Sequence, residues 1–168
     1  MNSASQNTED FNLSSDYYFS ENSRGNFFYK IYNTPRNYGD AKAQCESDGA
    51  FLAIPRSQAE NDFFAGLVPN QYIWIGIDYN EQEGRFVAVD GREISWTNWL
   101  TGQPDGDTSQ FAVAIRGSCN GSCNGTYNGR WYDRTASMGS SFVCSIYIEG
   151  TNFRFELFRP FLSKLRPE

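Results

Sequence analysis

The sequence predicts an α+β domain with two helices, short antiparallel sheets and a long irregular loop. Two helical patterns occur early in the chain, short segments rich in aromatic and β-branched residues follow, and an irregular stretch lies at about 97–109. Helices and strands that are separated along a chain are typical of α+β folds. An irregular stretch of this length is usually functional or disordered, and a bound cation is one reason for it to keep a shape. The 168 residues are enough for one domain with a substantial core.

The first predicted strand and helix lie at 27–32 and 36–47. The segment 27–32 is composed of aromatic and aliphatic residues around one lysine, which predicts a strand. In 36–47, the residues Tyr38, Ala41 and Cys45 recur at helical spacing, so they share one face of a helix. We therefore expect Cys45 to point into the core.

The second predicted helix begins after Ser57 and follows a short apolar strand at 51–54. Glu60 stands three residues after Ser57, which is the spacing of a capping box. Three apolar side chains are expected to form the core face of this helix: Phe63, Phe64 and Leu67. A buried strand at 72–77, built around Trp74, comes next.

The second half of the chain contains the remaining predicted strands. Residues 85–89 and 93–96 flank an Asp-Gly pair at 90–91, which is a strong turn signal, and together they predict a hairpin. The segment 118–129 is rich in glycine and predicts a loop. Three further strands are expected at 111–116, 129–132 and 141–148.

Composition and charge exclude several functions. The formal net charge of −6 argues against a nucleic-acid partner, and no apolar run reaches the roughly 20 residues that a membrane-spanning helix needs. The chain has no histidine, which removes the commonest general base and the commonest zinc ligand. Asp105, Asp107 and Asp133 resemble a glycosidase acid pair in type, but they lie in predicted loops with no aromatic-lined cleft. We expect no enzymatic activity.

Both ends of the chain are expected to lie outside the domain. Residues 1–26 are polar, lack an apolar leader segment and predict a flexible tail, as in the mature chain of a secreted protein. Residues 149–168 form an aromatic and basic extension. We expect its first part, 151–158, to be a strand that makes oligomer contacts, and the alternative is that it folds back over its own domain. Three N-glycosylation motifs also fit secretion, at Asn12, Asn120 and Asn124.

The order of a few short motifs carries more information than any one of them. A Gln-Pro-Asp motif at 103–105 places an amide oxygen and a carboxylate on either side of a locked ring. A Trp-Tyr-Asp motif at 131–133 supplies a second carboxylate. Cys45 and a Trp-Ile-Gly-Ile segment come before these motifs, and Cys144 comes after them. This series resembles the C-type lectin domain, and the resemblance covers residues 27–148.

The four cysteines are even in number and fit two disulfides, which also favours secretion over a cytosolic location. Three pairings are possible in principle. Cys119 and Cys123 are too close in sequence to be independent staples, so we pair them with each other and pair Cys45 with Cys144. The longer bridge then closes most of the domain.

The resemblance implies a calcium site in the long loop. Calcium-binding members of the family hold the ion with side-chain oxygens on both sides of the proline, a further acid and the two residues after the tryptophan. The matching positions, with Asp107 as a substitute donor, are Gln103, Asp105, Gln110, Tyr132 and Asp133. Gln110 and Tyr132 replace better ligands, so we expect weak calcium binding, about 0.1–1 mM. The alternative is that Gln103 and Asp105 only cap the loop by hydrogen bonding to backbone.

The resemblance also implies a class of sugar. Gln-Pro-Asp in this family accompanies galactose-type sugars, because the order of amide and acid across the proline decides which hydroxyl meets an acceptor. Galactose-type sites also stack the apolar face of the sugar on an aromatic ring. The candidate rings are Trp99, Phe111, Tyr127 and Tyr132.

Two functions are therefore expected from the sequence. The first is a secreted, weakly calcium-dependent lectin for galactose-type glycans. The second is a calcium-independent lectin-like domain that binds protein or assembles with itself. The second is supported by Gln110, by Tyr132 and by the aromatic extension at 149–168.

Overall fold

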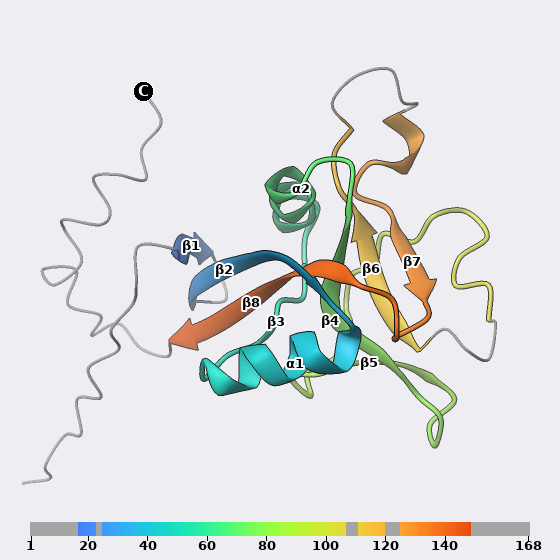
Figure 1. Cartoon of the computed structure of the whole chain (residues 1–168), viewed down its shortest axis with the longest axis horizontal. Helices are drawn as coiled ribbons and strands as arrows, with labels where there is room; N and C mark the ends of the chain where they lie inside the picture. The colour runs from blue at the N-terminus through green and yellow to red at the C-terminus, as the bar shows by residue number, and fades with distance from the viewer. Residues whose placement is uncertain (1–16, 23–24, 107–110, 120–124, 149–168) are drawn as a thin grey trace, which may run out of the picture.

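The computed structural model of the chain describes residues 17–22, 25–106, 111–119 and 125–148 (Figure 1). These ranges contain two α-helices, α1 (Tyr38–Ser47) and α2 (Gln58–Leu67), and a 3-10 turn, η1 (Gly125–Tyr127). Their strands are β1 (Tyr17–Asn22), β2 (Gly25–Arg36), β3 (Phe51–Leu52), β4 (Tyr72–Asn80), β5 (Arg85–Ala88), β6 (Ala112–Arg116), β7 (Trp131–Arg134) and β8 (Ser140–Ile148). The predicted α+β class is confirmed.

The strands form a single sheet in the order β1-β2-β8-β4-β6-β7, with β3 attached to β8 and β5 attached to β4. The pairings are antiparallel except that of β4 with β8, which is parallel at Ile73 and Trp74. The strand β7 ends this order, and the irregular stretch that follows β5 runs beside it (Figure 1). The long loop is therefore positioned by the last strand of the sheet.

Two hydrophobic clusters cover the two faces of the sheet. On one face, Tyr38 of α1 packs in a cluster with Trp74. On the other face, Phe64 of α2 packs in a cluster with Ile75 and Trp131. Successive residues of a strand point to opposite faces, which is why the neighbours Trp74 and Ile75 belong to different clusters. The fully buried Trp131 thus fixes β7 from the α2 side.

The starts of both helices have a local cause. α2 begins where the sequence predicted, because the Ser57 side chain accepts a hydrogen bond from the Glu60 amide. α1 begins two residues later than predicted, at Tyr38, because the Asn37 side chain caps it by accepting a hydrogen bond from the Asp40 amide at 2.8 Å.

The predicted long disulfide is confirmed. Cys45 of α1 and Cys144 of β8 are joined, they are 99 residues apart in sequence, and both side chains are fully buried. Cys119 is also disulfide-bonded, while Cys123, the partner predicted for it, lies outside the described residues. The long bridge ties α1 to the central part of the sheet.

The predicted core face of α2 is only partly right. Phe64 is fully buried, but Phe63 is 37% exposed and Leu67 is only partly buried. Asn61 takes a place in the core instead, because this side of α2 lies against the Gly129 carbonyl and the strand that follows it. The sequence-based prediction counted only apolar side chains on this helix and therefore missed Asn61.

The predicted hairpin across residues 90–91 is wrong. β5 pairs with β4 across a turn at 81–84, and residues 93–96 form no strand. Asp90 is bound instead to Arg56, whose Nη2 lies 2.9 and 2.7 Å from the two carboxylate oxygens. Because this ion pair fastens the turn to the start of α2, the chain after it does not return along β5.

The predicted tail at 1–26 includes a strand. β1 pairs with β2 in antiparallel register from Tyr17 opposite Lys30 to Asn22 opposite Gly25, so this part of the prediction is wrong. The extension at 149–168, with its predicted strand at 151–158, lies outside the described residues. In the part of the chain that the structure describes, no helix is long and apolar enough to cross a membrane.

Asn61 connects α2 to the end strand through two buried hydrogen bonds. Its Oδ1 accepts from the Trp131 Nε1 at 2.8 Å, and its Nδ2 donates to the Gly129 carbonyl at 2.9 Å. The Asn61 and Trp131 side chains are both fully buried. These bonds hold the strand that carries the predicted Asp133.

Replacing Asn61 by alanine is expected to lower the free energy of unfolding by about 2–4 kcal/mol, because the Trp131 N–H loses its acceptor and a small cavity remains. Chemical denaturation measures this change. Gln58→Ala, on the exposed side of the same helix, is the control and is expected to stay within about 0.5 kcal/mol of the parent protein. Similar losses in the two variants would contradict the role given to Asn61.

Candidate functional site

The Gln-Pro-Asp motif lies beside β7 because the chain before it is bound to that strand. Trp99 and Trp131 form a β-bridge, and the Leu100 amide donates to the Trp131 carbonyl at 3.1 Å. The Gln103 amide then donates to the Leu100 carbonyl at 2.8 Å, which turns the chain. The peptide bond between Gln103 and Pro104 is cis. The β-bridge and the backbone hydrogen bonds bring the motif to the end of the sheet.

Three of the predicted site residues meet at this point. The Asp133 carboxylate accepts hydrogen bonds from the Asp105 amide at 3.2 Å and from the Gly106 amide at 3.3 Å. The Asp133 amide donates to the Gln103 Oε1 at 3.1 Å, and the Gln103 Nε2 donates to an Asp105 carboxylate oxygen at 3.0 Å. Asp133 is 4% exposed, whereas Asp105 is exposed. Contacts to both the side chain and the backbone of Asp133 therefore hold the loop to β7.

The chemistry of these donors fits part of a calcium site. Two carboxylates and one amide oxygen are hard ligands of the type that calcium prefers, but calcium takes six to eight oxygens. Within the described ranges, no group of three or more acidic, cysteine or histidine side chains is placed to hold a metal ion. The two other predicted donors, Asp107 and Gln110, lie outside those ranges. The hydrogen bond from the Asp133 amide to the Gln103 side chain is also of the type expected if Gln103 only caps the loop.

Tyr132 lies on the opposite face of β7 from Asp133. Its ring packs edge-on against Tyr72 of β4, with 5.4 Å between centroids. Burial raises the pKa of Tyr132 above its usual value, and the nearby Tyr72 and Tyr127 phenols add to this while Arg116 opposes it. The structure therefore does not bring Tyr132 to the loop, although it follows Trp131 directly in sequence.

The other candidate rings are placed differently. Trp99 is partly buried and contacts Trp131 and Phe86 at 5.6 and 5.2 Å between centroids, so its ring serves the core. Phe111 is also partly buried and lies against Tyr79. Tyr127 is 48% exposed, but it belongs to η1 and lies near Tyr132 rather than near the loop. The predicted glycosylation positions Asn12, Asn120 and Asn124 lie outside the described residues.

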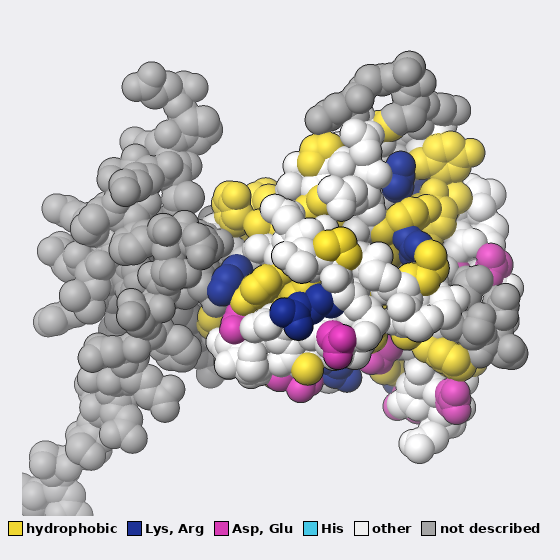
Figure 2. All heavy atoms as spheres, in the orientation of Figure 1, with side chains coloured by type: hydrophobic (Ala, Val, Ile, Leu, Met, Phe, Trp, Pro, Cys, Tyr) yellow, Lys and Arg dark blue, Asp and Glu magenta, His cyan; other side chains and the backbone are white. Residues whose placement is uncertain are grey.

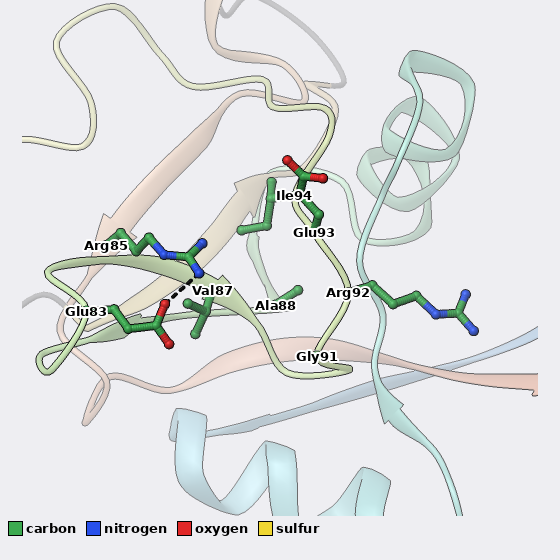
Figure 3. Close-up of a pocket in the computed structure, with 8 residues that line it drawn as sticks. All are labelled: Glu83, Arg85, Val87, Ala88, Gly91, Arg92, Glu93 and Ile94. Carbon is green, nitrogen blue, oxygen red and sulfur yellow. Dashed lines mark ion pairs between the residues drawn. The ribbon is translucent and has the colours of Figure 1, made fainter.

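A separate hollow of about 480 Å³, which no sequence motif predicts, lies beside β5 (Figure 3). Glu83 and Arg85 form an ion pair at its edge, 2.5 Å apart, and Arg92 points away from the other lining residues (Figure 3). Its lining includes neither Gln103 nor Asp133. Because Glu83 and Arg85 pair with each other and the predicted site residues lie elsewhere, the loop at the end of β7 remains the stronger candidate site.

This sheet with two helices, the long disulfide and a loop bound to the last strand define a C-type lectin-like domain. The family model described as Lectin C-type domain matches residues 34–146, which is most of the chain. The chain therefore belongs to the C-type lectin domain family.

The chain is similar to several known proteins of this kind. Lectin BRA-3 from Megabalanus rosa is 30% identical over 115 residues, which are 67% of this chain and 67% of that protein. Across five curated relatives, the chain spans 31% to 67% of the relative's own length. The solved structure of the C-type lectin CEL-I from Cucumaria echinata matches with a TM-score of 0.68 and 22% identity, over 82% of this chain and 99% of that chain. A calcium-independent type II antifreeze protein matches with a TM-score of 0.66 and 16% identity, over 80% of this chain and 94% of that chain. These two likenesses show the fold alone.

Proposed function

We propose that the chain is a secreted, non-catalytic lectin domain that binds galactose-type glycans with weak dependence on calcium. The observation that carries the proposal is the meeting of Gln103, Asp105 and Asp133, which come from segments 28 to 30 residues apart. Polar oxygens gathered from distant segments are what the recognition of a cation or of sugar hydroxyls requires. Membership of a lectin family and similarity to Lectin BRA-3 support the same function.

Calcium would be held by the Gln103 amide oxygen and by the Asp105 and Asp133 carboxylates, with Asp107 and Gln110 as further donors. When bound, calcium supplies coordination positions for sugar hydroxyls. The chain contributes the orientation of the donors, since the Gln103 amide group is bonded to Asp105 on one side and to the Asp133 backbone on the other. The Asp133 carboxylate accepts hydrogen bonds from two backbone amides, so a calcium ion competes with these amides for the carboxylate oxygens. We therefore expect a dissociation constant for calcium of about 0.1–1 mM.

The order of the two motif side chains supports the galactose class of sugar. Gln103 offers both an acceptor and donors, whereas the ionised Asp105 offers only acceptors, so exchanging them would reverse the pattern that two neighbouring hydroxyls meet. Asp105 is the exposed member of the group and is the one that a sugar reaches first. Trp99 and Tyr132 are occupied elsewhere, so we assign no stacking ring to this loop.

Calcium at 10 mM is expected to raise the melting temperature by several degrees, and EDTA is expected to reverse the rise. A ligand present at 10 to 100 times its dissociation constant stabilises the folded state by about 1.4–2.7 kcal/mol. Differential scanning fluorimetry measures the shift, and magnesium at the same concentration is the control. Isothermal titration in calcium is then expected to show binding of galactose and weaker binding of mannose. An unchanged melting temperature together with retained galactose binding would contradict the role given to calcium.

The second candidate is a calcium-independent domain that binds protein or assembles with itself. The favouring observation is that the Asp133 carboxylate accepts hydrogen bonds from the Asp105 and Gly106 amides, which bind the loop to β7. The similar antifreeze structure is described as calcium-independent. Under this reading, sedimentation of the full chain shows concentration-dependent association that EDTA leaves unchanged. A monomer at all concentrations would count against self-assembly.

A further inference from the structure

The face of the sheet opposite Asp133 carries a cluster that the loop site does not use. We call it the arginine–tyrosine face, and it consists of Tyr72, Arg116, Tyr127, Tyr132 and Arg134. Figure 2 shows basic side chains set among hydrophobic ones on the side of the molecule where β6 and β7 lie. Because residues of β7 alternate between faces, Tyr132 and Arg134 lie on one side of the sheet and Asp133 lies on the other.

The strand register explains how these side chains come together. Tyr72 of β4 is paired with Arg116 of β6, while Ala112 and Ala114 of β6 are paired with Arg134 and Tyr132 of β7. The two alanines are small, so the long side chains of β7 reach across them toward Tyr72. The Arg134 guanidinium lies 3.7 Å from the centre of the Tyr72 ring, and that of Arg116 lies 5.0 Å from it. One ring thus has two cations against it.

Within the described ranges of the chain, no acidic side chain balances the charges of this face. Neither Arg116 nor Arg134 forms an ion pair with any residue that the structure describes, and the hydrogen-bond acceptor found for the Arg134 guanidinium is the weakly accepting Met138 sulfur at 3.2 Å. Burial lowers the pKa of Arg134, and the charge of Arg116 lowers it further while the Tyr72 phenol acts in the opposite sense. Two like charges held against one ring repel each other, and an anion that contacts both guanidinium groups relieves this repulsion.

We propose that the arginine–tyrosine face binds a saccharide that carries a single oxyanion substituent, either a sulfate or a carboxylate. Arg116 and Arg134 hold the oxyanion, because the planar guanidinium fork matches two of its oxygens. Tyr132 and the exposed Tyr127 offer ring surface to the sugar. The net charge of −6 repels a polyanion, which is why a single charged substituent fits this chain better than a nucleic acid does.

This site is independent of the function proposed for the loop, and titration in EDTA separates the two. We expect galactose 6-sulfate or galacturonic acid to bind the full chain at least about tenfold more tightly than galactose, measured by chemical-shift changes of the tyrosine ring protons. A preference for the sulfated sugar identifies sulfate as the substituent, and a preference for galacturonic acid identifies a carboxylate. Equal affinity for galactose and both acidic sugars would overturn the proposal.

Arg116→Gln and Arg134→Gln are each expected to reduce the preference for the acidic sugar to about threefold or less. Arg130→Gln is the matched control, since its guanidinium donates to Asn98 and lies outside the cluster, and it should keep the preference. Because Arg134 packs on Tyr72, its replacement could unfold the protein, and thermal melting of the Arg134→Gln variant checks that it is folded. If that variant fails to fold, Arg116→Gln alone tests the proposal. Loss of the preference in Asp133→Asn but not in the arginine variants would overturn the proposal by assigning the anion to the loop. Tighter binding of a tyrosine-sulfated peptide than of either acidic sugar would overturn the choice of a saccharide.

Discussion

Replacing Asp133 by asparagine is expected to reduce galactose binding at least about tenfold and to lower the free energy of unfolding by about 1–3 kcal/mol. The carboxylate accepts both the Asp105 and the Gly106 amides, and an asparagine can accept with only one of its two groups. One amide of the loop then faces an N–H group, and a charge-assisted hydrogen bond is lost. Isothermal titration and chemical denaturation measure the two effects.

Asp62→Asn is the matched control for this experiment. Asp62 is an exposed acid on α2, so the substitution makes the same change in net charge away from the loop. We expect its stability to stay within about 0.5 kcal/mol of the parent protein and its galactose binding to be unchanged. If Asp133→Asn binds galactose as well as Asp62→Asn does, the loop at the end of β7 is not the sugar site.

Removing the long disulfide, by replacing both Cys45 and Cys144 with alanine, is expected to lower the free energy of unfolding by about 2–5 kcal/mol. The bridge joins residues 99 positions apart and so restricts most of the unfolded chain. Both side chains are fully buried, so their packing is lost as well. Chemical denaturation under non-reducing conditions gives the magnitude.

The paired replacement of Cys119 and Cys123 is the comparison for the long bridge. These cysteines are four positions apart in sequence, and the stabilisation from a cross-link grows with the length of chain that it closes. A smaller loss of stability is therefore expected. If this variant loses as much free energy of unfolding as the Cys45 and Cys144 variant, or more, the long disulfide is not the main stabilising cross-link.

The fold was largely predictable because its signals are local. The Ser57 cap, the spacing of Cys45 in α1 and the apolar run around Trp74 each appear within a few residues, and each has its place in the structure. The hairpin at 90–91 was not predictable in this way, since the turn signal is real but Arg56 binds Asp90 from 34 residues away. Long-range pairing overrides a local turn preference where the partner charge is close in space.

The site was predicted in part, for a similar reason. The motif spacing identified Gln103, Asp105 and Asp133, and the structure brings these three together. The same motif spacing also predicted Tyr132 as a site residue, but the alternation of side chains along β7 places it on the opposite face of the sheet from Asp133. Because a motif gives the order of residues but not the strand on which they lie, the direction of the Tyr132 side chain could not be derived from it.

A crystal structure grown with millimolar calcium and galactose decides whether the loop at the end of β7 is a calcium-dependent sugar site. We expect an ion bound by Gln103, Asp105 and Asp133, with two sugar hydroxyls on the same ion. Only water between Asp105 and Asp133, with galactose absent or bound at another surface, would contradict it.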